Sequence, residues 1–286
     1  MTTDKWASWL LSRRDGGDPD VRRRFAPTLL AFRDGVLDRA AIAPGDRVLD
    51  LGTGYGLIGF GALERVGPTG RVVFSDVSAE LLADCRRTAA GDPRCEFVQT
   101  SADDLAGIPD DSIDVVTTRS VLMYLADKER AFAECARVLR PGGRLSIFEP
   151  INRFVAGRGP NHLIGLDLSP VGDLVAKVLT AYTGETALVD FDERDLLRWA
   201  EGAGFTAIEM DYRVQVEVPA DEPPGAWAAM RRTAPNPLAP TYEEAMAATL
   251  TEPERERLES FISEQMASGA VRRTTLATAF LRAVAR

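Results

Sequence analysis

A short run near the start of the chain carries the residues best placed to do chemistry. Val48 to Leu51 reads as a buried strand with a carboxylate, Asp50, close to its end, and glycines follow at 52, 54 and 56. Glycine tolerates positive φ and lets bare backbone approach a ligand. Asp50 adds negative charge at a position where a ligand amine could lie. The order of strand, carboxylate and alternating glycines indicates a binding site for a nucleoside cofactor.

The loop can be interpreted as a site for either of two nucleoside cofactors. Residues Gly54 to Gly59 satisfy the G-x-G-x-x-G pattern of dinucleotide sites, and Asp76 follows at about 20 residues. A dinucleotide, however, needs its first glycine directly after the strand, so that pyrophosphate meets a helix N-terminus, and a carboxylate there repels phosphate. The first glycine here is Gly52, and counting from it places Leu57 where the third should stand. S-adenosylmethionine (SAM) carries an ammonium, a sulfonium and no phosphate, so Asp50 favours SAM over NAD.

The glycine run resembles the first motif of the class I SAM-dependent methyltransferases, of the small-molecule type that includes the ubiquinone and menaquinone biosynthesis enzymes. The resemblance is close over residues 45–150 and architectural elsewhere. It implies an α/β fold with a Rossmann-like, doubly wound, seven-stranded sheet whose last strand is antiparallel, plus helical lid and cap insertions. It also implies SAM as cofactor, with S-adenosylhomocysteine (SAH) as product. The cofactor contacts implied in this loop are Asp50, Gly52, Thr53, Gly54 and Gly56.

A second strand extends the predicted cofactor site. Residues 71–78 read as a buried strand ending in Asp76, followed by Val77. The carboxylate of Asp76 can accept two hydrogen bonds from ribose hydroxyls. Asp76 and Ser78 could instead cap the helix that begins near Ala79, and the two roles are compatible, with Ser78 as the cap.

The third and fourth strands supply the remaining cofactor contacts that the resemblance implies. After the third strand, the chain has Ser101 where relatives commonly have Asp. We therefore expect the adenine to meet the backbone amides of Ala102 and Asp103, together with either the Ser101 hydroxyl or the Asp103 carboxylate. The exit of the fourth strand, at Arg119 and Ser120, is expected to border the methionine part of SAM.

Turns and composition divide the rest of the chain. The run Leu139 to Arg144, with Pro141-Gly142-Gly143, is predicted to end a helix and launch the fifth strand at Leu145. Ligands of doubly wound sheets bind beyond the carboxyl ends of the strands, so an insertion there should overhang the transferred methyl group. We expect an N-terminal helical lid (1–44), a SAM-binding core (45–150), a substrate-cap insertion (151–192) and a C-terminal part of the core (193–286) with a helical insertion at about 219–269.

Five side chains are candidates for contact with the methyl acceptor. His162 is the only histidine, and it is either a catalytic base or a lid residue without a catalytic role. Tyr124 follows the fourth strand, where many family members carry a histidine, and could hydrogen-bond the acceptor or line its pocket. Glu149, Asn152 and Arg153 follow the fifth strand and could bind substrate, or could cap a helix and hydrogen-bond within their loop.

Composition narrows the class of protein. The chain has 286 residues, of which 45% are hydrophobic, enough for one large α/β domain with additions. A net charge of -9 and a sequence pI near 4.9 argue against a nucleic-acid substrate. No apolar run is long enough to span a membrane and no leader pattern is present, so we expect a cytoplasmic enzyme. Three cysteines at no metal spacing are expected to be buried free thiols, with no metal site.

These observations favour a SAM-dependent methyltransferase that acts on an O or N atom, ahead of C, of a small organic molecule in specialised metabolism. Family members that methylate arsenic use cysteines in the substrate half, and this chain has none after Cys135. Two alternatives stay open: a SAM-binding enzyme that does not methylate, such as a cyclase or decarboxylase, and an NAD-dependent oxidoreductase.

Overall fold

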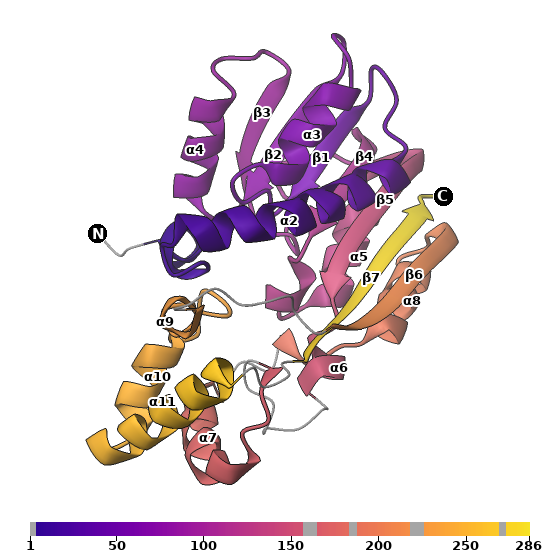
Figure 1. Ribbon diagram of the computed structural model, residues 1–286. Coiled ribbons are helices and arrows are strands. Elements are labelled where there is room, and N and C mark those ends of the chain that lie inside the picture. Colours follow the sequence, from indigo (N-terminus) through magenta and orange to yellow (C-terminus); the bar gives the residue numbers. More distant parts are fainter. Residues whose placement is uncertain (1–3, 157–164, 183–187, 218–225, 269–272) are drawn as a thin grey trace. The chain divides into compact units, whose positions relative to one another are not determined.

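The computed structural model describes residues 4–156, 165–182, 188–217, 226–268 and 273–286 (Figure 1). The chain forms two compact units. One unit, here called the sheet unit, consists of Ala26–Ile151, Asp190–Arg213 and Thr278–Arg286. The other, the helical unit, consists of Met1–Phe25, Asn152–Val189 and Val214–Ala277.

A seven-stranded sheet carries the fold, in the order β3-β2-β1-β4-β5-β7-β6. Strands β1 to β5 pair with one another in the parallel direction, and β7 pairs with β5 in the antiparallel direction. The strands are β1 (Arg47–Leu51), β2 (Arg71–Asp76), β3 (Cys95–Gln99), β4 (Ile113–Arg119), β5 (Leu139–Pro150), β6 (Thr206–Glu217) and β7 (Thr274–Val284). The predicted doubly wound sheet with an antiparallel last strand is therefore confirmed.

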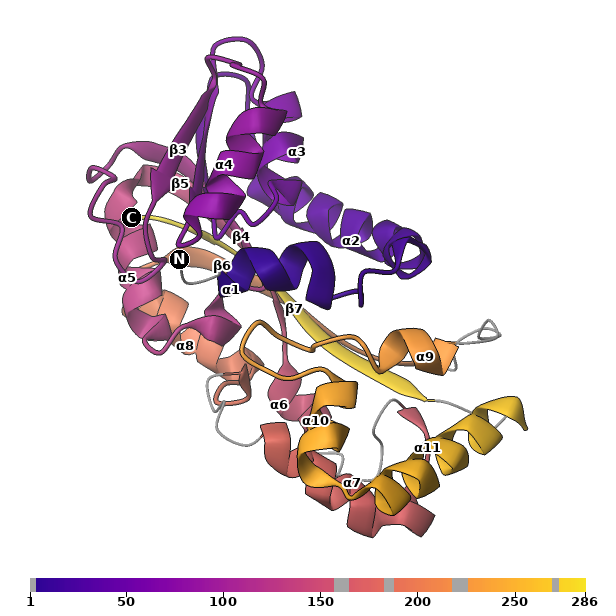
Figure 2. The same ribbon diagram turned by 90° about the vertical axis from the view of Figure 1, so that its left-hand side faces the viewer.

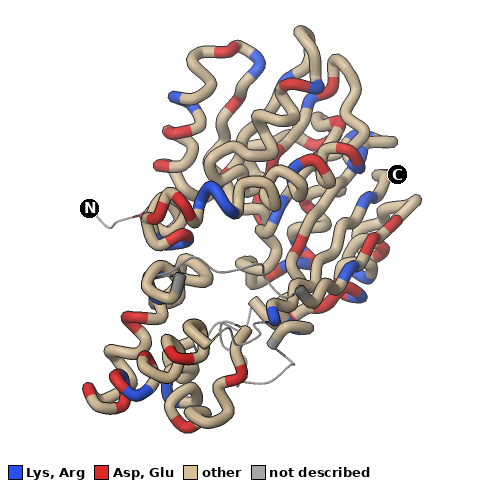
Figure 3. The backbone as a smooth tube through the Cα atoms, in the orientation of Figure 1, with Lys and Arg blue, Asp and Glu red and all other residues tan. Residues whose placement is uncertain are grey.

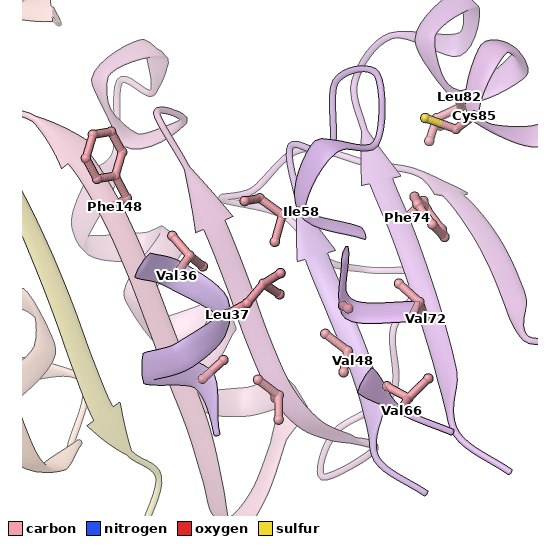
Figure 4. Close-up of a cluster of buried hydrophobic side chains, with 13 residues drawn as sticks. Val36, Leu37, Val48, Ile58, Val66, Val72, Phe74, Leu82, Cys85 and Phe148 are labelled. Atoms are coloured by element: carbon pink, nitrogen blue, oxygen red, sulfur yellow. The ribbon is translucent and has the colours of Figure 1, made fainter. Parts of the chain in front are cut away.

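Helices cover both faces of the sheet, as the two ribbon views show (Figures 1 and 2). Helices α2 (Pro19–Ala40), α3 (Leu57–Arg65) and α4 (Ala79–Thr88) contribute to one apolar cluster with strand residues such as Val48, Val72 and Phe148 (Figure 4). On the other face, α5 (Lys128–Val138) and α8 (Glu193–Gly202) meet through Phe132 and Trp199, whose ring centroids lie 6.0 Å apart. The central strands β1, β2 and β4 are therefore buried on both sides, as their mostly apolar residues require.

The start of β5 differs from the sequence prediction. The run Leu139 to Arg144 was predicted to precede the strand, but it belongs to β5 itself. Leu139 pairs with Ile113 and Arg144 pairs with Val115, so the extra residues form an irregularity opposite β4. Gly142, at φ 77°, provides the backbone conformation that this irregularity needs. Pro-Gly-Gly therefore acts as a bulge within a strand.

The helical unit has an apolar core of its own. Its helical elements are α1 (Lys5–Ser8), a π-helix η1 (Trp9–Arg13), α6 (Asn152–Ala156), η4 (Ser169–Val171), α7 (Gly172–Leu179), η5 (Thr180–Tyr182), α9 (Ala226–Met230), α10 (Tyr242–Thr249) and α11 (Glu252–Ala267). Leu174 and Val178 of α7 belong to the same buried cluster as Met246 of α10 and Ile262 of α11. The insertion after β5 and the insertion after β6 thus share one core.

The N-terminal segment is tied to the second insertion within the helical unit. The indole Nε1 of Trp9 donates to the carbonyl of Ala234 at 2.8 Å, and the amide of Ala234 donates to the carbonyl of Arg13 at 2.9 Å. The Arg13 guanidinium also pairs with the Glu244 carboxylate at 2.6 Å. Residues far apart in the sequence therefore complete one unit.

Charged residues, cysteines and apolar helices were each the subject of an expectation from composition. Basic and acidic residues are interspersed along the backbone (Figure 3). Cys85 and Cys135 are buried free thiols as predicted, whereas Cys95 is only half-buried. Among the helices that the structure describes, none has the length and apolar character needed to cross a membrane.

The α3–β2 contact generates a stability prediction. A Cβ atom at Gly59 would lie 2.3 Å from Cε1 of Phe74, a fully buried ring that also stacks on Phe97. We expect Gly59→Ala to lower the free energy of unfolding by about 2 kcal/mol, as overpacked cores do. Gly202→Ala on α8 is the matched control, because nothing lies within 4 Å of its Cβ position. Urea unfolding should show little change for the control; equal stability of the two variants would contradict the packing argument.

Candidate functional site

The predicted cofactor residues gather at one edge of the sheet. Strands β3, β2, β1 and β4 are adjacent and parallel, so their carboxyl ends lie side by side. The predicted contacts follow these four strands in the chain. They are Asp50, Gly52, Thr53, Gly54 and Gly56 at β1, Asp76 and Val77 at β2, Ser101, Ala102 and Asp103 at β3, and Arg119 and Ser120 at β4. This is the edge at which doubly wound folds bind ligands.

Asp50 is buried, and its carboxylate is bonded within the protein. Its Oδ2 accepts hydrogen bonds from the Thr53 hydroxyl at 2.6 Å and the Gly59 amide at 2.8 Å, and Oδ1 accepts from the Thr117 hydroxyl at 3.3 Å. Burial raises the pKa of Asp50 to about 6, although these bonds and the charge of Arg119 favour the ionised form. Asp50 thereby joins the glycine loop, the first turn of α3 and β4.

The glycine loop needs residues without a Cβ. Gly52, Gly54 and Gly56 have φ values of 65°, 57° and 87°. A Cβ at Gly52 would lie 2.4 Å from Cγ2 of Val121, so the loop after β1 packs directly on the loop after β4. The Gly54 carbonyl accepts from the Cys85 thiol at 3.3 Å. The loop is therefore braced from both sides.

Asp76 links the first two loops. Its Oδ2 accepts from the Gly54 amide and its Oδ1 from the Ser78 amide, both at 2.9 Å. Capping of α4 falls to Ser78, whose hydroxyl accepts from the Leu81 amide at 3.0 Å. Ribose binding by Asp76 stays a prediction. Next to it, the apolar side chain of Val77 is 44% exposed.

The loop after β3 is held by hydrogen bonds between its own residues. The Ser101 hydroxyl donates to the Asp103 carboxylate, and Ser101 also bridges to Asp104. Arg130 of α5 donates from Nε to the Asp103 carbonyl at 2.7 Å. The Ser101 hydroxyl and the Asp103 carboxylate, the two alternatives for holding adenine, are thus hydrogen-bonded to each other. A role of either in adenine binding stays a prediction.

The exit of β4 has an unusual backbone. Ser120 has φ 56°, a left-handed conformation that non-glycine residues rarely adopt, and its amide donates to the Phe148 carbonyl at 2.9 Å. The short helix η2 (Leu122–Tyr124) follows. Glu149 of β5 is fully buried, and its Oε1 accepts from the amides of Val121 and Leu122 at 2.7 and 2.9 Å. Glu149 therefore binds the main chain of this turn.

The other predicted acceptor contacts are distributed over the chain. Tyr124 ends η2 and is half-buried, while Asn152 and Arg153 open α6 in the helical unit. His162 lies outside the described residues. Substrate and catalytic roles for these residues stay predictions. Within the described ranges, no group of three or more His, Cys, Asp or Glu side chains could hold a metal ion.

Three residues that support this edge escaped the sequence prediction. Thr117 lies opposite Asp50 in the β1–β4 register, Gly59 supplies an amide to Asp50, and Val121 fills the space left by Gly52. A signal existed for Thr117, because the fourth strand carries two threonines just before its end. The other two depend on how separate loops pack, which spacing does not reveal.

Comparison with known proteins agrees with this fold. A family model described as a methyltransferase domain matches residues 49–147. The chain is 34% identical over 177 residues to a ubiquinone/menaquinone biosynthesis C-methyltransferase of Hahella chejuensis, covering 59% of this chain and 70% of that protein. It is 38% identical over 114 residues to an arsenite methyltransferase of Halobacterium salinarum, a match that covers 39% of this chain but only 29% of that protein.

A solved structure shares the fold at low identity. It is phosphoethanolamine N-methyltransferase 2 of Haemonchus contortus in complex with SAM, with a TM-score of 0.52 and 19% identity over 98% of this chain and 56% of that one. The sheet order and the glycine loop thus define a Rossmann-like protein of the class that binds nucleoside cofactors. The matches to family members place it further: the chain belongs to the class I SAM-dependent methyltransferase family.

The buried carboxylate of Asp50 generates a prediction on stability and pH. Because burial raises its pKa to about 6, the folded chain holds this proton more tightly than the unfolded chain does. The free energy of unfolding should therefore fall as pH rises from about 4 to about 6, by on the order of 3 kcal/mol from this group. Asp50→Asn should remove that part of the slope. Urea unfolding from pH 4 to pH 8 measures it.

The control is Asp211→Asn, which changes an exposed carboxylate on β6 paired with Arg39. Its slope should follow that of the wild type between the same pH values. Identical slopes for Asp50→Asn and the wild type would show that Asp50 is not protonated in this range.

Proposed function

We propose that this protein transfers a methyl group from SAM to an O or N atom of a small organic molecule, with Asp76 binding the ribose and the glycine loop lying under the methionine part. Arg119 and Ser120 would border that part at the β4 exit. The loop at Ser101 to Asp103 would hold the adenine.

One observation carries the choice of SAM over a dinucleotide. Helix α3 begins at Leu57, and the amide of Gly59 in its first turn donates to the Asp50 carboxylate at 2.8 Å. The positive end of the helix dipole therefore already faces an anion of the protein. A pyrophosphate needs that same helix N-terminus and would be repelled by Asp50. SAM brings no phosphate, and its ammonium and sulfonium are attracted by a carboxylate at this edge.

The acceptor atom decides whether a base is needed. An amine attacks through its own lone pair, whereas a hydroxyl or an acidic carbon is helped by a base that removes its proton. Asp50 and Glu149 are buried and hydrogen-bonded to protein groups, so neither is proposed as that base. His162 is the base candidate for a hydroxyl acceptor. Transfer to carbon is the alternative, because a matched relative is named as a C-methyltransferase.

Selection of the acceptor is assigned to the helical unit. The first insertion follows Pro150, the last residue of β5. The second insertion ends within β7, just before Thr278. Pro150 and Thr278 pair with each other in the sheet, so both insertions join it at the edge that carries the cofactor residues. Positioning of the acceptor and exclusion of water can supply much of the rate of an in-line methyl transfer.

Cofactor binding can be tested by calorimetric titration of the wild type with SAH and, in parallel, with NADH. We expect SAH to bind and NADH not to bind. Asp76→Ala should weaken SAH about 10- to 100-fold, because hydrogen bonds to a carboxylate contribute about 1.5–3 kcal/mol. Asp38→Ala, which removes an exposed carboxylate of α2, is the control and should bind SAH like the wild type. Binding of NADH but not SAH would overturn the proposal, and full SAH affinity in Asp76→Ala would overturn the ribose assignment.

Methyl transfer itself requires an assay with acceptors. The protein should convert SAM to SAH only when a panel of small amines, phenols and carboxylic acids contains a suitable acceptor. Mass spectrometry should then find one added methyl group on that acceptor, and fragmentation should place it on N or O. Tight SAH binding with an acceptor-dependent rearrangement and no added methyl would instead identify a non-methylating SAM-binding enzyme.

A further inference from the structure

The strongest unexplained feature of the sheet unit is the carboxylate of Glu149. Its Oε1 accepts from the amides of Val121 and Leu122, and the Met123 amide of the same turn also favours its charge. Oε2 is buried and accepts no hydrogen bond within 3.5 Å. A buried acceptor without a partner is costly, and a buried charge is more so. An apolar or amide side chain would fill this position at a lower cost if packing were its whole role.

The turn that Glu149 binds is held in a strained conformation. Ser120 lies in the left-handed region, at φ 56°, directly before the two amides that Glu149 accepts. Such a backbone persists only when its surroundings fix it. Glu149 supplies that constraint from β5, and the Ser120 amide bonded to the Phe148 carbonyl supplies a second one.

The same turn supports the cofactor loop. The Val121 side chain occupies the space in which a Cβ of Gly52 would lie, at 2.4 Å from Cγ2. Glu149 therefore contacts Val121, and Val121 contacts Gly52. Glu149 and the glycine loop are thus connected through one packed residue, Val121.

Neighbouring groups favour the charge of Glu149, whereas burial opposes it. Arg119 of β4 favours its ionised form, and the same arginine favours the ionised form of Asp50 on β1. The amides of η2 point their positive ends at Oε1, and β7 places Ala279 opposite Glu149 in register. Burial nevertheless raises the pKa of Glu149 to about 7, so its charge changes near neutral pH.

We propose that Glu149 is a positioning residue of the cofactor site. When ionised, it holds the β4 exit turn against Gly52, and when protonated, it holds this turn less tightly. The affinity for the cofactor therefore follows the ionisation of Glu149. The proposal rests on the proposed SAM site. Loss of the charge weakens the two bonds from Val121 and Leu122, because hydrogen bonds to an ionised acceptor are about twice as strong as those to a neutral one.

The sign of the effect follows from linkage. If the cofactor binds better when Glu149 is ionised, binding must lower its pKa and release a proton near neutral pH. Affinity then rises with pH and levels off once Glu149 is fully ionised. A pKa lowered by about one unit corresponds to an affinity change of up to about tenfold.

The experiment is calorimetric titration with SAH from pH 6 to pH 8.5 on the wild type, Glu149→Gln and Glu96→Gln. Glutamine keeps an oxygen for the Val121 and Leu122 amides but cannot ionise. We expect the wild-type dissociation constant to rise about five- to tenfold as pH falls from 8.5 to 6. Glu149→Gln should bind with the low-pH affinity throughout. Glu96→Gln, which changes a carboxylate of β3 paired with Arg47, should follow the wild type.

A second readout is the number of protons released on binding. Titrations at pH 7 in two buffers of different ionisation enthalpy give this number, and it should be larger in the wild type than in Glu149→Gln. The comparison is needed because Asp50, whose pKa is raised to about 6, contributes to both. A flat pH profile, with proton release no larger than in Glu149→Gln, in a wild type that binds SAH would overturn the inference alone. No binding of SAH by the folded wild type at any pH would overturn the proposed function, and the inference with it.

Discussion

The hydrogen bonds of the buried Asp50 carboxylate are the interaction on which the rest of the cofactor edge depends. The cofactor edge is the edge of the sheet at which β1 to β4 end. A buried acid must have hydrogen-bond donors, and those of Asp50 come from three different parts of the chain: the glycine loop, the first turn of α3 and the neighbouring strand β4. The loop can satisfy Asp50 only when β1 and β4 are in register and α3 has begun. The conformation of the glycine loop therefore depends on the pairing of the strands. The loop is already formed before a ligand binds.

The other loops of this edge are braced in the same way. Asp76 holds the Gly54 amide from β2, the Cys85 thiol donates to the Gly54 carbonyl from α4, and Val121 fills the space at Gly52 from the β4 exit. Each contact joins the loop after β1 to another part of the chain. A site of this kind is held by its supporting residues before the ligand arrives, which lowers the ordering cost of binding. Glu149 extends the bracing to β5.

Much of this was predictable from the sequence, and the reason is local. Strands ending in Asp50 and Asp76, alternating glycines and a Ser78 cap are patterns within a few residues, and the structure confirms the strands, the glycine conformations and the cap. Thr117 and Val121 were not predicted, because they depend on register and packing between strands. For Glu149, the structure shows the helix-capping alternative, with the amides that open η2 donating to it. The Pro141-Gly142-Gly143 run follows the end of α5 as predicted, but only pairing with β4 shows that it lies within β5.

The match to the methyltransferase-domain model lies within the sheet unit. It ends at residue 147, just before the first insertion begins, and it contains the bracing contacts of β1, β2 and β4. The two insertions instead bury their apolar residues against each other, in a core that includes both α7 and α11. Neither insertion could change alone without exposing that core. The sheet unit and the helical unit thus have separate apolar cores.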